Sequence, residues 1–401
     1  MALRIVASHP DPAIVRLPWA DPLETWPEAP EGVVVSMPQG LSRHVVRMVR
    51  LGHRTYAVKE TVEEMATREY RMLRDLQRLD LPAVVPQAVV AGRVGRDGEP
   101  LPAALLTRHL EFSRPYRALF ENSPSGTLLD RLVDALVVLL VRLHLADFYW
   151  GDVSLSNVLF RRDAGHFAAY LVDAETGELK SSISDRMREH DVTVGCENVF
   201  AELLDLAAAV GADVDAFAVI QRIQDRYAEL WRELTGEEHF STDELWRIEQ
   251  RIQRLNDLGF DVGELDIVTD VDGETVRLTP RVVELGHHRR RLRELTGLEV
   301  EDRQARQLLN DLAAYTAHQG LTGRDPKAVA SRWLTEVYEP VIGCIPPELT
   351  GRLDPAEIFH EILVHRWFLS EAAGHEVDIF ETARSYISSI LPGRPSEGVA
   401  P

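Results

Sequence analysis

The chain has 401 residues, of which 45% are hydrophobic and 27% are charged, enough for two or three globular domains with sizeable cores. Asp and Glu outnumber Lys and Arg by 64 to 44, which gives a net charge of −20. A charge of this sign excludes a general binder of nucleic acids or anionic membranes, because phosphate surfaces require a basic face. The two cysteines, Cys196 and Cys344, indicate neither a disulfide framework nor a zinc site.

Neither a signal peptide nor a transmembrane segment is predicted. Met1–Pro12 lacks an apolar core flanked by basic residues and a small-residue cleavage site. The most hydrophobic run, Leu128–Leu145, contains Arg131, Asp134 and Arg142, which is typical of a buried helix and not of a membrane span. We therefore expect a cytoplasmic protein.

The N-terminal part is predicted to be a proline-rich lead-in followed by a small antiparallel sheet. Residues 1–31 contain frequent prolines and should form an irregular segment that packs Trp19 and Trp26 on the body of the protein. Apolar and β-branched runs separated by turns then predict strands. The expected strands are Gly32–Met37, Val45–Leu51, Thr55–Lys59, Val84–Val94 and Leu101–Thr107. Between the third and fourth, Glu63–Leu79 has the three- and four-residue apolar spacing of a helix.

A long apolar helix and two acidic loops follow. Glu111–Ser125 is predicted to be a connector, and Leu128–Phe148 a helix that is apolar on nearly every face and therefore buried. Asp152 and Asn157 lie five residues apart in the next loop, and Asp173 follows the apolar run Ala169–Val172, 21 residues after Asp152. Loops of this kind can bring two carboxylates and an amide to one point, which suits a nucleotide-bound metal ion and a hydroxyl acceptor. The alternative is that this acidic loop, capped by Asn157, only connects two strands and has no catalytic role.

The motif Trp-Gly-Asp-Val-Ser-Leu-Ser-Asn-Val-Leu-Phe, from Trp150 to Phe160, preceded by Leu143-His144, resembles the catalytic loop of the protein-kinase-like superfamily. The amino-acid sequence of this motif is closer to that of lipopolysaccharide and other small-substrate kinases than to that of protein kinases. The chain also resembles an uncharacterised actinobacterial family, a domain of unknown function, in which such a half precedes a helical C-terminal half. The resemblance implies that Asp152 orients or deprotonates the acceptor hydroxyl and that Asn157 and Asp173 hold Mg²⁺.

The same resemblance assigns roles in the small lobe. Tyr-Ala-Val-Lys places Lys59 where the superfamily has the lysine of the ATP α- and β-phosphates. Glu69, rather than Glu63 or Glu64, is the predicted partner of Lys59 because it has apolar neighbours. The residues alone leave Lys59 open as an edge charge and the glutamates as solvent-facing acids. The backbone of Thr107–Leu110 should meet the adenine, and His144 should have a structural role.

Two places depart from the superfamily pattern. The loop over the phosphates, Met37–His44, has one glycine, Gly40, so that Ser42 and Arg43 are predicted to supply contacts that backbone amides usually supply. Trp150-Gly151 replaces the usual His-Arg, which argues against regulation through a phosphorylated activation loop. Glu175, two residues after Asp173, is either a further metal ligand or a solvated turn residue.

The remainder is predicted to be mostly helical and is less diagnostic. A β-hairpin is expected at Glu264–Leu278, turning at Asp272-Gly273. The predicted helices are Asn198–Val210, Asp215–Thr235, Thr242–Leu258, Val329–Val341, Pro355–Ala373 and Ile379–Leu391. A calcium loop at Val268–Thr279 lacks the required first Asp, and His360 and His365 do not have the spacing of a zinc site. The basic run His287–Arg293 is either a solvated helix face or a site for phosphate, an acidic lipid or RNA.

We therefore predict an α+β fold with a bilobal, kinase-like N-terminal half and a mostly α-helical C-terminal half. The expected parts are a lead-in (1–31), an antiparallel-sheet small lobe (32–110), a helical large lobe (111–210), a helical domain with one hairpin (211–391) and a flexible tail (392–401). The predicted function is ATP- and Mg²⁺-dependent phosphoryl transfer to a small-molecule, sugar or lipid-linked hydroxyl. The alternative is a catalytically weak or inactive nucleotide-binding scaffold. A protein partner is expected at the helical half, and DNA is not expected as a ligand.

Overall fold

The computed structural model describes two compact units. The described residues are 2–8, 11–27, 34–35, 44–52, 54–122, 126–210, 214–236, 238–241, 246–257, 260–269 and 275–398. Unit 1 contains Met1–Arg161 and Ala169–Tyr227, and unit 2 contains Arg162–Ala168 and Ala228–Pro401. The division falls within α5 (Ala216–Thr235), later than the boundary at residue 210 that the sequence suggested.

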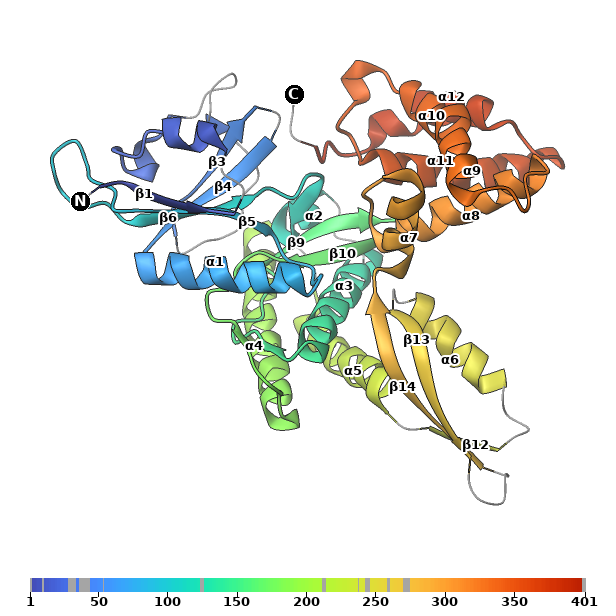
Figure 1. Ribbon diagram of the computed structural model, residues 1–401, viewed down its shortest axis with the longest axis horizontal. Coiled ribbons are helices and arrows are strands. Elements are labelled where there is room, and N and C mark those ends of the chain that lie inside the picture. Colours follow the sequence, from blue (N-terminus) through green and yellow to red (C-terminus); the bar gives the residue numbers. More distant parts are fainter. Residues whose placement is uncertain are drawn as a thin grey trace. The chain divides into compact units, whose positions relative to one another are not determined.

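Unit 1 begins with a six-stranded antiparallel sheet in the order β1-β5-β6-β4-β3-β2. Its strands are β1 Arg4–Ala7, β2 Val34–Val35, β3 Val46–Leu51, β4 Arg54–Thr61, β5 Val85–Ala91 and β6 Ala103–Arg108. The edge strand β1 lies in the segment predicted to be irregular. Helix α1 (Glu63–Arg78) lies against β5 and β6 (Figure 1). The helix forms there because Ala66, Tyr70, Leu73 and Leu76, at three- and four-residue steps, bury one face.

The N-terminal segment packs on this sheet as expected. Trp19 and Trp26 are buried in the core of the sheet, next to two short 3₁₀ helices, Pro12–Arg16 and Leu23–Thr25. Arg93 holds the segment. Its fully buried guanidinium pairs with Glu60 at 2.6 Å and donates to the Asp21 carbonyl at 2.8 Å and the Trp19 carbonyl at 3.2 Å.

The rest of unit 1 is helical with short strands. The elements are β7 Ser113–Pro115, α2 Tyr116–Asn122, α3 Gly126–Leu145, β8 Phe148–Tyr149, β9 Val158–Asp163, β10 His166–Leu171, β11 Glu178–Leu179 and α4 Asp185–Val210. The predicted connector contains β7 and α2, and α4 begins 13 residues before the helix predicted at Asn198. The first turns of α4 escaped prediction because the buried positions there include Arg188 and Asp191, which break the apolar periodicity.

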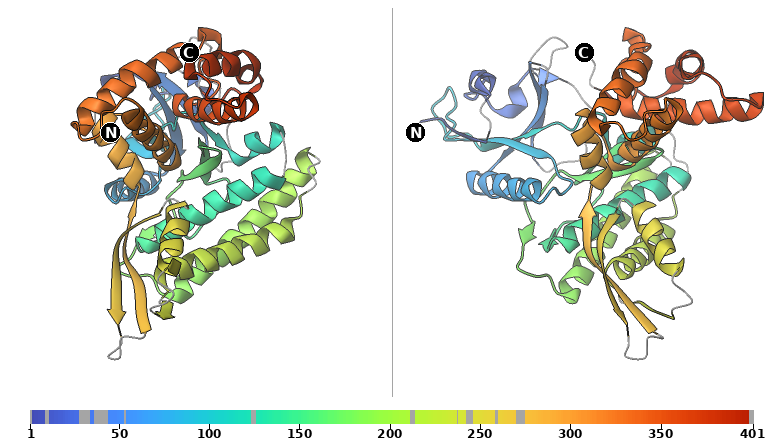
Figure 2. Two further views of the ribbon diagram at one scale, coloured as in Figure 1. Left: turned by 90° about the vertical axis from the view of Figure 1, so that its right-hand side faces the viewer. Right: turned by 45° about the vertical axis from the view of Figure 1, so that its right-hand side comes forward.

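Helices α3 and α5 run side by side (Figure 2). Ion pairs join them at two successive turns, Arg222 with Asp130, and Arg226 with Asp134 at 2.9 Å. α3 buries ten of its residues, including His144 near its end, so the expected central buried helix is present.

Unit 2 contains a three-stranded sheet in the order β12-β14-β13. Its elements are β12 Glu238–Ser241, α6 Trp246–Asp257, β13 Phe260–Thr269 and β14 Thr275–Leu285. The two long strands β13 and β14 pair antiparallel (Figure 2), over a wider range than the hairpin predicted at Glu264–Leu278. The predicted turn at Asp272-Gly273 lies outside the described residues.

Six helices surround the apolar core of unit 2. They are α7 His287–Thr296, α8 Asp302–His318, α9 Pro326–Trp333, α10 Glu339–Gly343, α11 Pro355–Ala373 and α12 Ile379–Ser389. Trp333, Tyr338 and Phe359 are buried and in mutual ring contact. The helix predicted at Val329–Val341 is interrupted by a π-helical turn, Leu334–Tyr338. Pro340 explains it, because proline has no N–H for the regular helical hydrogen bond.

The described residues of the predicted tail make specific contacts. A 3₁₀ turn, Leu391–Gly393, ends the helical region, and Glu397 is buried. The Glu397 N–H donates to the Arg352 carbonyl at 2.9 Å, and its carboxylate pairs with Arg162 Nε at 2.9 Å. The partner Arg162 is 235 residues away from Glu397 in the sequence, so no local pattern indicates this contact.

Within the described residues no helix has the length and apolar character needed to cross a membrane. Val364, Trp367 and Phe368 on α11 are exposed. Cys196 on α4 is buried, which raises its pKa to about 11, whereas Cys344, just after α10, is exposed.

Candidate functional site

The candidate site is built around Lys59, near the end of β4. The Lys59 Nζ lies 2.7 Å from Glu69 Oε2, 3.0 Å from Asp173 Oδ2 and 3.8 Å from Glu175 Oε2. Strand β4 supplies the lysine, α1 supplies Glu69, and the loop after β10 supplies the other two acids. The selection of Glu69 over Glu63 and Glu64 agrees with this geometry, because Glu69 is 1% exposed and reaches the lysine.

The charges around Lys59 are unbalanced. Burial and repulsion by Asp173 raise the pKa of Glu69 to about 7, against the attraction of Lys59. Burial alone would lower the pKa of Lys59, but attraction to Glu69 and Asp173 outweighs it, and the pKa is raised. Three carboxylates therefore share one ammonium group, with His44 Nε2 at 3.2 Å from Glu175.

The loop after β8 carries Asp152 and Asn157. The Asn157 side-chain amide donates to Asp152 Oδ2 and to the Asp152 carbonyl, each at 3.1 Å. Gly151, just before Asp152, has a φ of +78°, and a Cβ there would lie 3.2 Å from the Tyr149 ring. This backbone conformation favours glycine, which explains Gly151 in the Trp-Gly-Asp motif.

Two backbone links and one side-chain hydrogen bond tie this loop to the loop of Asp173. The Val172 N–H donates to the Asn157 carbonyl at 3.0 Å. On the other side, β11 pairs with β8, and the Thr176 hydroxyl donates to the Trp150 carbonyl at 2.8 Å. The two acidic loops are therefore adjacent, as their order along the chain predicts.

Helix α4 supports the loop with three side chains that the sequence analysis missed. Asp191 accepts from the Trp150 and Gly151 N–H groups at 2.8 Å each. Asn198 donates to Asp152 Oδ1 at 3.1 Å and to the Val153 carbonyl at 3.0 Å. Glu202 accepts from the Leu155 and Ser156 N–H groups at 2.8 and 2.9 Å, and from the Ser156 hydroxyl.

These three residues are seven and four positions apart, so they share one face of the helix. That spacing was the available signal, but their partners lie 40 to 47 residues earlier in the chain. His144 has the structural role predicted for it. Its ring contacts Asp191 Oδ2 at 3.1 Å and the Tyr227 hydroxyl at 2.6 Å.

The acidic group near Lys59 fits a divalent cation of the magnesium type. Ligand atoms of Glu69, Asp173 and Glu175 all lie within 4.8 Å of one another. Carboxylate and amide oxygens are the ligands that Mg²⁺ prefers. Three carboxylates face the single ammonium group of Lys59, so that added positive charge would be stabilised.

Other predicted residues have other contacts or lie outside the described part of the chain. Gly40, Ser42 and Arg43 lie outside the described residues. In the predicted hinge, the His109 N–H is already donated to the Thr55 carbonyl at 2.9 Å, and burial lowers the pKa of the His109 ring to about 4. The basic run forms the first turns of α7, where Arg291 pairs with Glu294 at 3.8 Å.

Comparison with known proteins gives two matches that together cover most of the chain. Residues 40–195 match the lipopolysaccharide kinase (Kdo/WaaP) family, and residues 229–391 match a domain of unknown function, DUF4032. A solved structure described as WaaP in complex with acyl carrier protein is similar, with a TM-score of 0.35 and 19% identity. That similarity covers 64% of this chain and 99% of that one. No curated protein matches the chain.

These matches confirm the predicted resemblance, to lipopolysaccharide kinases in the first half and to a domain of unknown function in the second. They also confirm the predicted fold class. The chain is α+β, with a kinase-like half that opens on an antiparallel sheet and a C-terminal half that is mostly helical.

Proposed function

We propose, starting from the match of residues 40–195 to the lipopolysaccharide kinase family, that this protein is an ATP-dependent phosphotransferase. The observation that carries the proposal is that the Lys59 Nζ pairs with both Glu69 and Asp173, from separate elements of the chain. Phosphoryl transfer is catalysed mainly by positioning and by charge stabilisation. A lysine fixed between two carboxylates beside an Asp-Asn loop provides the groups for both.

Each residue of the site has a proposed task. Lys59 binds the α- and β-phosphates, and Glu69 holds Lys59 in place. Asn157 and Asp173 hold Mg²⁺, with Glu175 as a further candidate ligand. The ion, when bound, neutralises phosphate charge and orients the phosphoryl group. Asp152 accepts the proton of the acceptor hydroxyl, and Asn198 fixes the orientation of its carboxylate through Oδ1.

The proposed acceptor is a hydroxyl of a sugar, a lipid-linked sugar or another small molecule. The support is the family of the match, which is named for lipopolysaccharide. The amino-acid sequence of the Asp152 loop also supports a small-molecule or sugar acceptor, because Trp150-Gly151 stands where protein kinases have His-Arg.

The test is transfer of the labelled γ-phosphoryl group from ATP, in the presence of Mg²⁺, to a panel of sugars and glycolipids and to water. We expect Asp152→Asn to lower transfer by about 10²- to 10⁴-fold, the usual contribution of a general base. The control is Asp97→Asn, on an exposed turn of the small lobe, which should keep full activity. Equal activity of Asp152→Asn and the unmodified protein would contradict the proposal.

A nucleotide-binding scaffold is the second candidate, and one sequence feature favours it. Met37–His44 has a single glycine, whereas loops that hold phosphates through backbone amides are usually glycine-rich. Tight binding of Mg²⁺ and ATP without transfer to any acceptor or to water would support the scaffold.

A further inference from the structure

The hairpin formed by β9 and β10 links the proposed metal ligands to unit 2. β9 begins directly after Asn157, and β10 ends two residues before Asp173. The two strands are neighbours in one sheet. The end of the hairpin, residues 162–168, which we call the hairpin tip, belongs to the compact unit 2.

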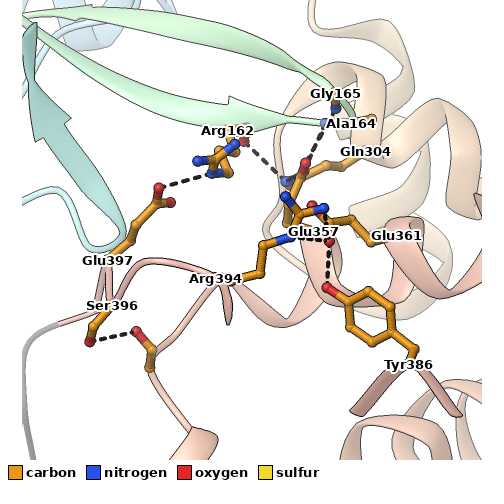
Figure 3. Close-up of polar contacts among 11 residues, drawn as sticks. Arg162, Ala164, Gly165, Gln304, Glu357, Glu361, Tyr386, Arg394, Ser396 and Glu397 are labelled. Atoms are coloured by element: carbon orange, nitrogen blue, oxygen red, sulfur yellow. Dashed lines mark hydrogen bonds and ion pairs between the residues drawn. The ribbon is translucent and has the colours of Figure 1, made fainter. Parts of the chain in front are cut away.

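The turn at the hairpin tip binds a buried carboxylate of α11. Ala164 and Gly165 have φ values of +50° and +80°, so their N–H groups are free of the strand pairing and converge on one point. The Ala164 N–H donates to Glu357 Oε2 at 2.8 Å, and the Gly165 N–H donates to Glu357 Oε1 at 3.2 Å (Figure 3). Glu357 is 1% exposed.

Gln304, in the first turn of α8, adds further bonds to the hairpin tip. Its side-chain amide donates to Glu357 Oε2 at 2.8 Å and to the Arg162 carbonyl at 3.1 Å (Figure 3). Its backbone N–H donates to Asp163 Oδ1 at 2.8 Å. Both Gln304 and Asp163 are buried, and buried polar groups of this kind lose much stability if a partner is removed.

The C-terminal segment holds the same tip from another direction. The Arg162 Nε donates to Glu397 Oε1 at 2.9 Å (Figure 3). Three elements distant in sequence, α8, α11 and the segment after α12, therefore bind backbone or side-chain groups of one turn. Directional hydrogen bonds fix the position of this turn more narrowly than apolar contacts would.

We propose that unit 2 positions the metal-binding end of the β9–β10 hairpin and that Glu357 is the positioning residue in this unit. The inference rests on the proposed function, because it takes Asn157 and Asp173 as Mg²⁺ ligands. Strands of this length span about 20 Å and are stiff because they are paired. A displacement at the hairpin tip therefore reaches the residues at its base. The region that matches the domain of unknown function then acts on the kinase-like site.

The experiment compares two glutamates of α11 that are one helical turn apart. Glu357→Gln replaces an acceptor with an amide N–H₂ facing the donors of the hairpin tip. Glu361→Gln is the matched control, because Glu361 binds Tyr386 and Arg394 within unit 2 and makes none of the described contacts with the tip (Figure 3). The quantity measured is the affinity for a non-hydrolysable ATP analogue, with Mg²⁺ and without it.

We expect Glu357→Gln to reduce the gain in affinity that Mg²⁺ provides by about 10-fold or more, the usual effect of groups that orient metal ligands. Its affinity without Mg²⁺ should stay that of the unmodified protein, because Lys59 and Glu69 are untouched. Glu361→Gln should keep the full gain. An unchanged gain in Glu357→Gln, or an equal loss in both variants, would overturn the inference.

Two further measurements keep the outcome decisive. If Glu357→Gln does not fold, Gln304→Met removes only the side-chain amide contacts and should reduce the Mg²⁺ gain in the same direction. Hydrogen exchange of residues 158–171 should become faster in Glu357→Gln and not in Glu361→Gln, and equal exchange in the two would count against the inference. If the unmodified protein gains no affinity from Mg²⁺, the proposed function itself fails, whatever the variants do.

Discussion

Binding of a cation should change the protonation of Glu69. Burial and the neighbouring Asp173 raise its pKa to about 7, so near neutral pH about half of the molecules hold a proton there. Positive charge added beside Asp173 removes that repulsion and lowers the pKa. We expect binding of Mg²⁺ alone at pH 7 to release up to roughly half a proton per molecule, measured by calorimetry in buffers of different ionisation enthalpy. Glu69→Gln should release none from this source, and an unchanged release in that variant would contradict the assignment.

Asp163, at the hairpin tip, makes the stability of unit 2 depend on pH. Burial and repulsion by Glu301 raise its pKa from 3.8 to about 8. The folded protein keeps this proton between those values while the unfolded chain loses it, so the stability contribution falls as the pH rises from about 4 to about 8. Above pH 8 the folded state carries a buried charge.

Asp163→Asn should remove this pH dependence, because Asn keeps an acceptor for the Gln304 N–H and cannot ionise. At pH 8.5 we expect the variant to be more stable than the unmodified protein by roughly 1–3 kcal/mol. The difference should shrink towards pH 4. Urea unfolding at both pH values measures it, and a difference that grows towards low pH would show that the sign is wrong.

At the scale of elements, α4 supports the catalytic loop through a single face. Asn198→Ala removes the donor to Asp152 Oδ1 and leaves Lys59 and the phosphate contacts in place. We expect turnover to fall by about 10- to 100-fold with little change in the KM for ATP. Asp205→Asn, an exposed position of the same helix, is the control for general damage to α4. A raised KM with unchanged turnover would assign Asn198 to substrate binding instead.

The N-terminal segment depends on one buried arginine. Arg93→Ala removes the guanidinium that pairs with Glu60 and binds the carbonyls of Trp19 and Asp21. Removing one partner of a buried ion pair costs about 3–5 kcal/mol, and we expect a loss of that size in urea unfolding.

The neighbouring Arg96 is the matched control. It pairs with the Asp21 carboxylate at 2.6 Å, but its side chain is 77% exposed. Solvent screens such pairs, so Arg96→Ala should leave the unfolding midpoint almost unchanged. Equal effects of the two substitutions would mean that burial of Arg93 is not the source of the stability.

Across the whole molecule, the parts that could be predicted from sequence are those encoded locally. Lys59 lies near the end of a strand, Asp152 and Asn157 share one loop, and Glu69 has apolar neighbours, so each position could be predicted from a short window of sequence. Glu202 and Glu357 were not readable in this way. They bind backbone N–H groups of loops that are 46 and 193 residues away, and any residue type offers such a group. Contacts between a loop and side chains that are distant in sequence therefore could not be predicted from local sequence patterns.

The charge of the whole chain makes a further prediction. A net charge of −20 repels polyanions, and Arg291 of the basic run is paired with Glu294. We expect single-stranded RNA to bind no more tightly than about 10⁻⁴ M at physiological salt, the level of non-specific binding. Fluorescence anisotropy of a labelled oligonucleotide measures this. Micromolar affinity that strengthens steeply as salt is lowered would assign an RNA site to α7.

The contrast between the two cysteines has a practical consequence. A maleimide reacts with the thiolate, and a thiol with a pKa of about 11, as in Cys196, is ionised in about one molecule in ten thousand at neutral pH. Cys344 is exposed, so a fluorophore added to the unmodified chain should attach there alone. Since Cys344 lies in unit 2 and Cys196 in unit 1, such a dye marks the helical half without engineering and without touching the kinase-like half.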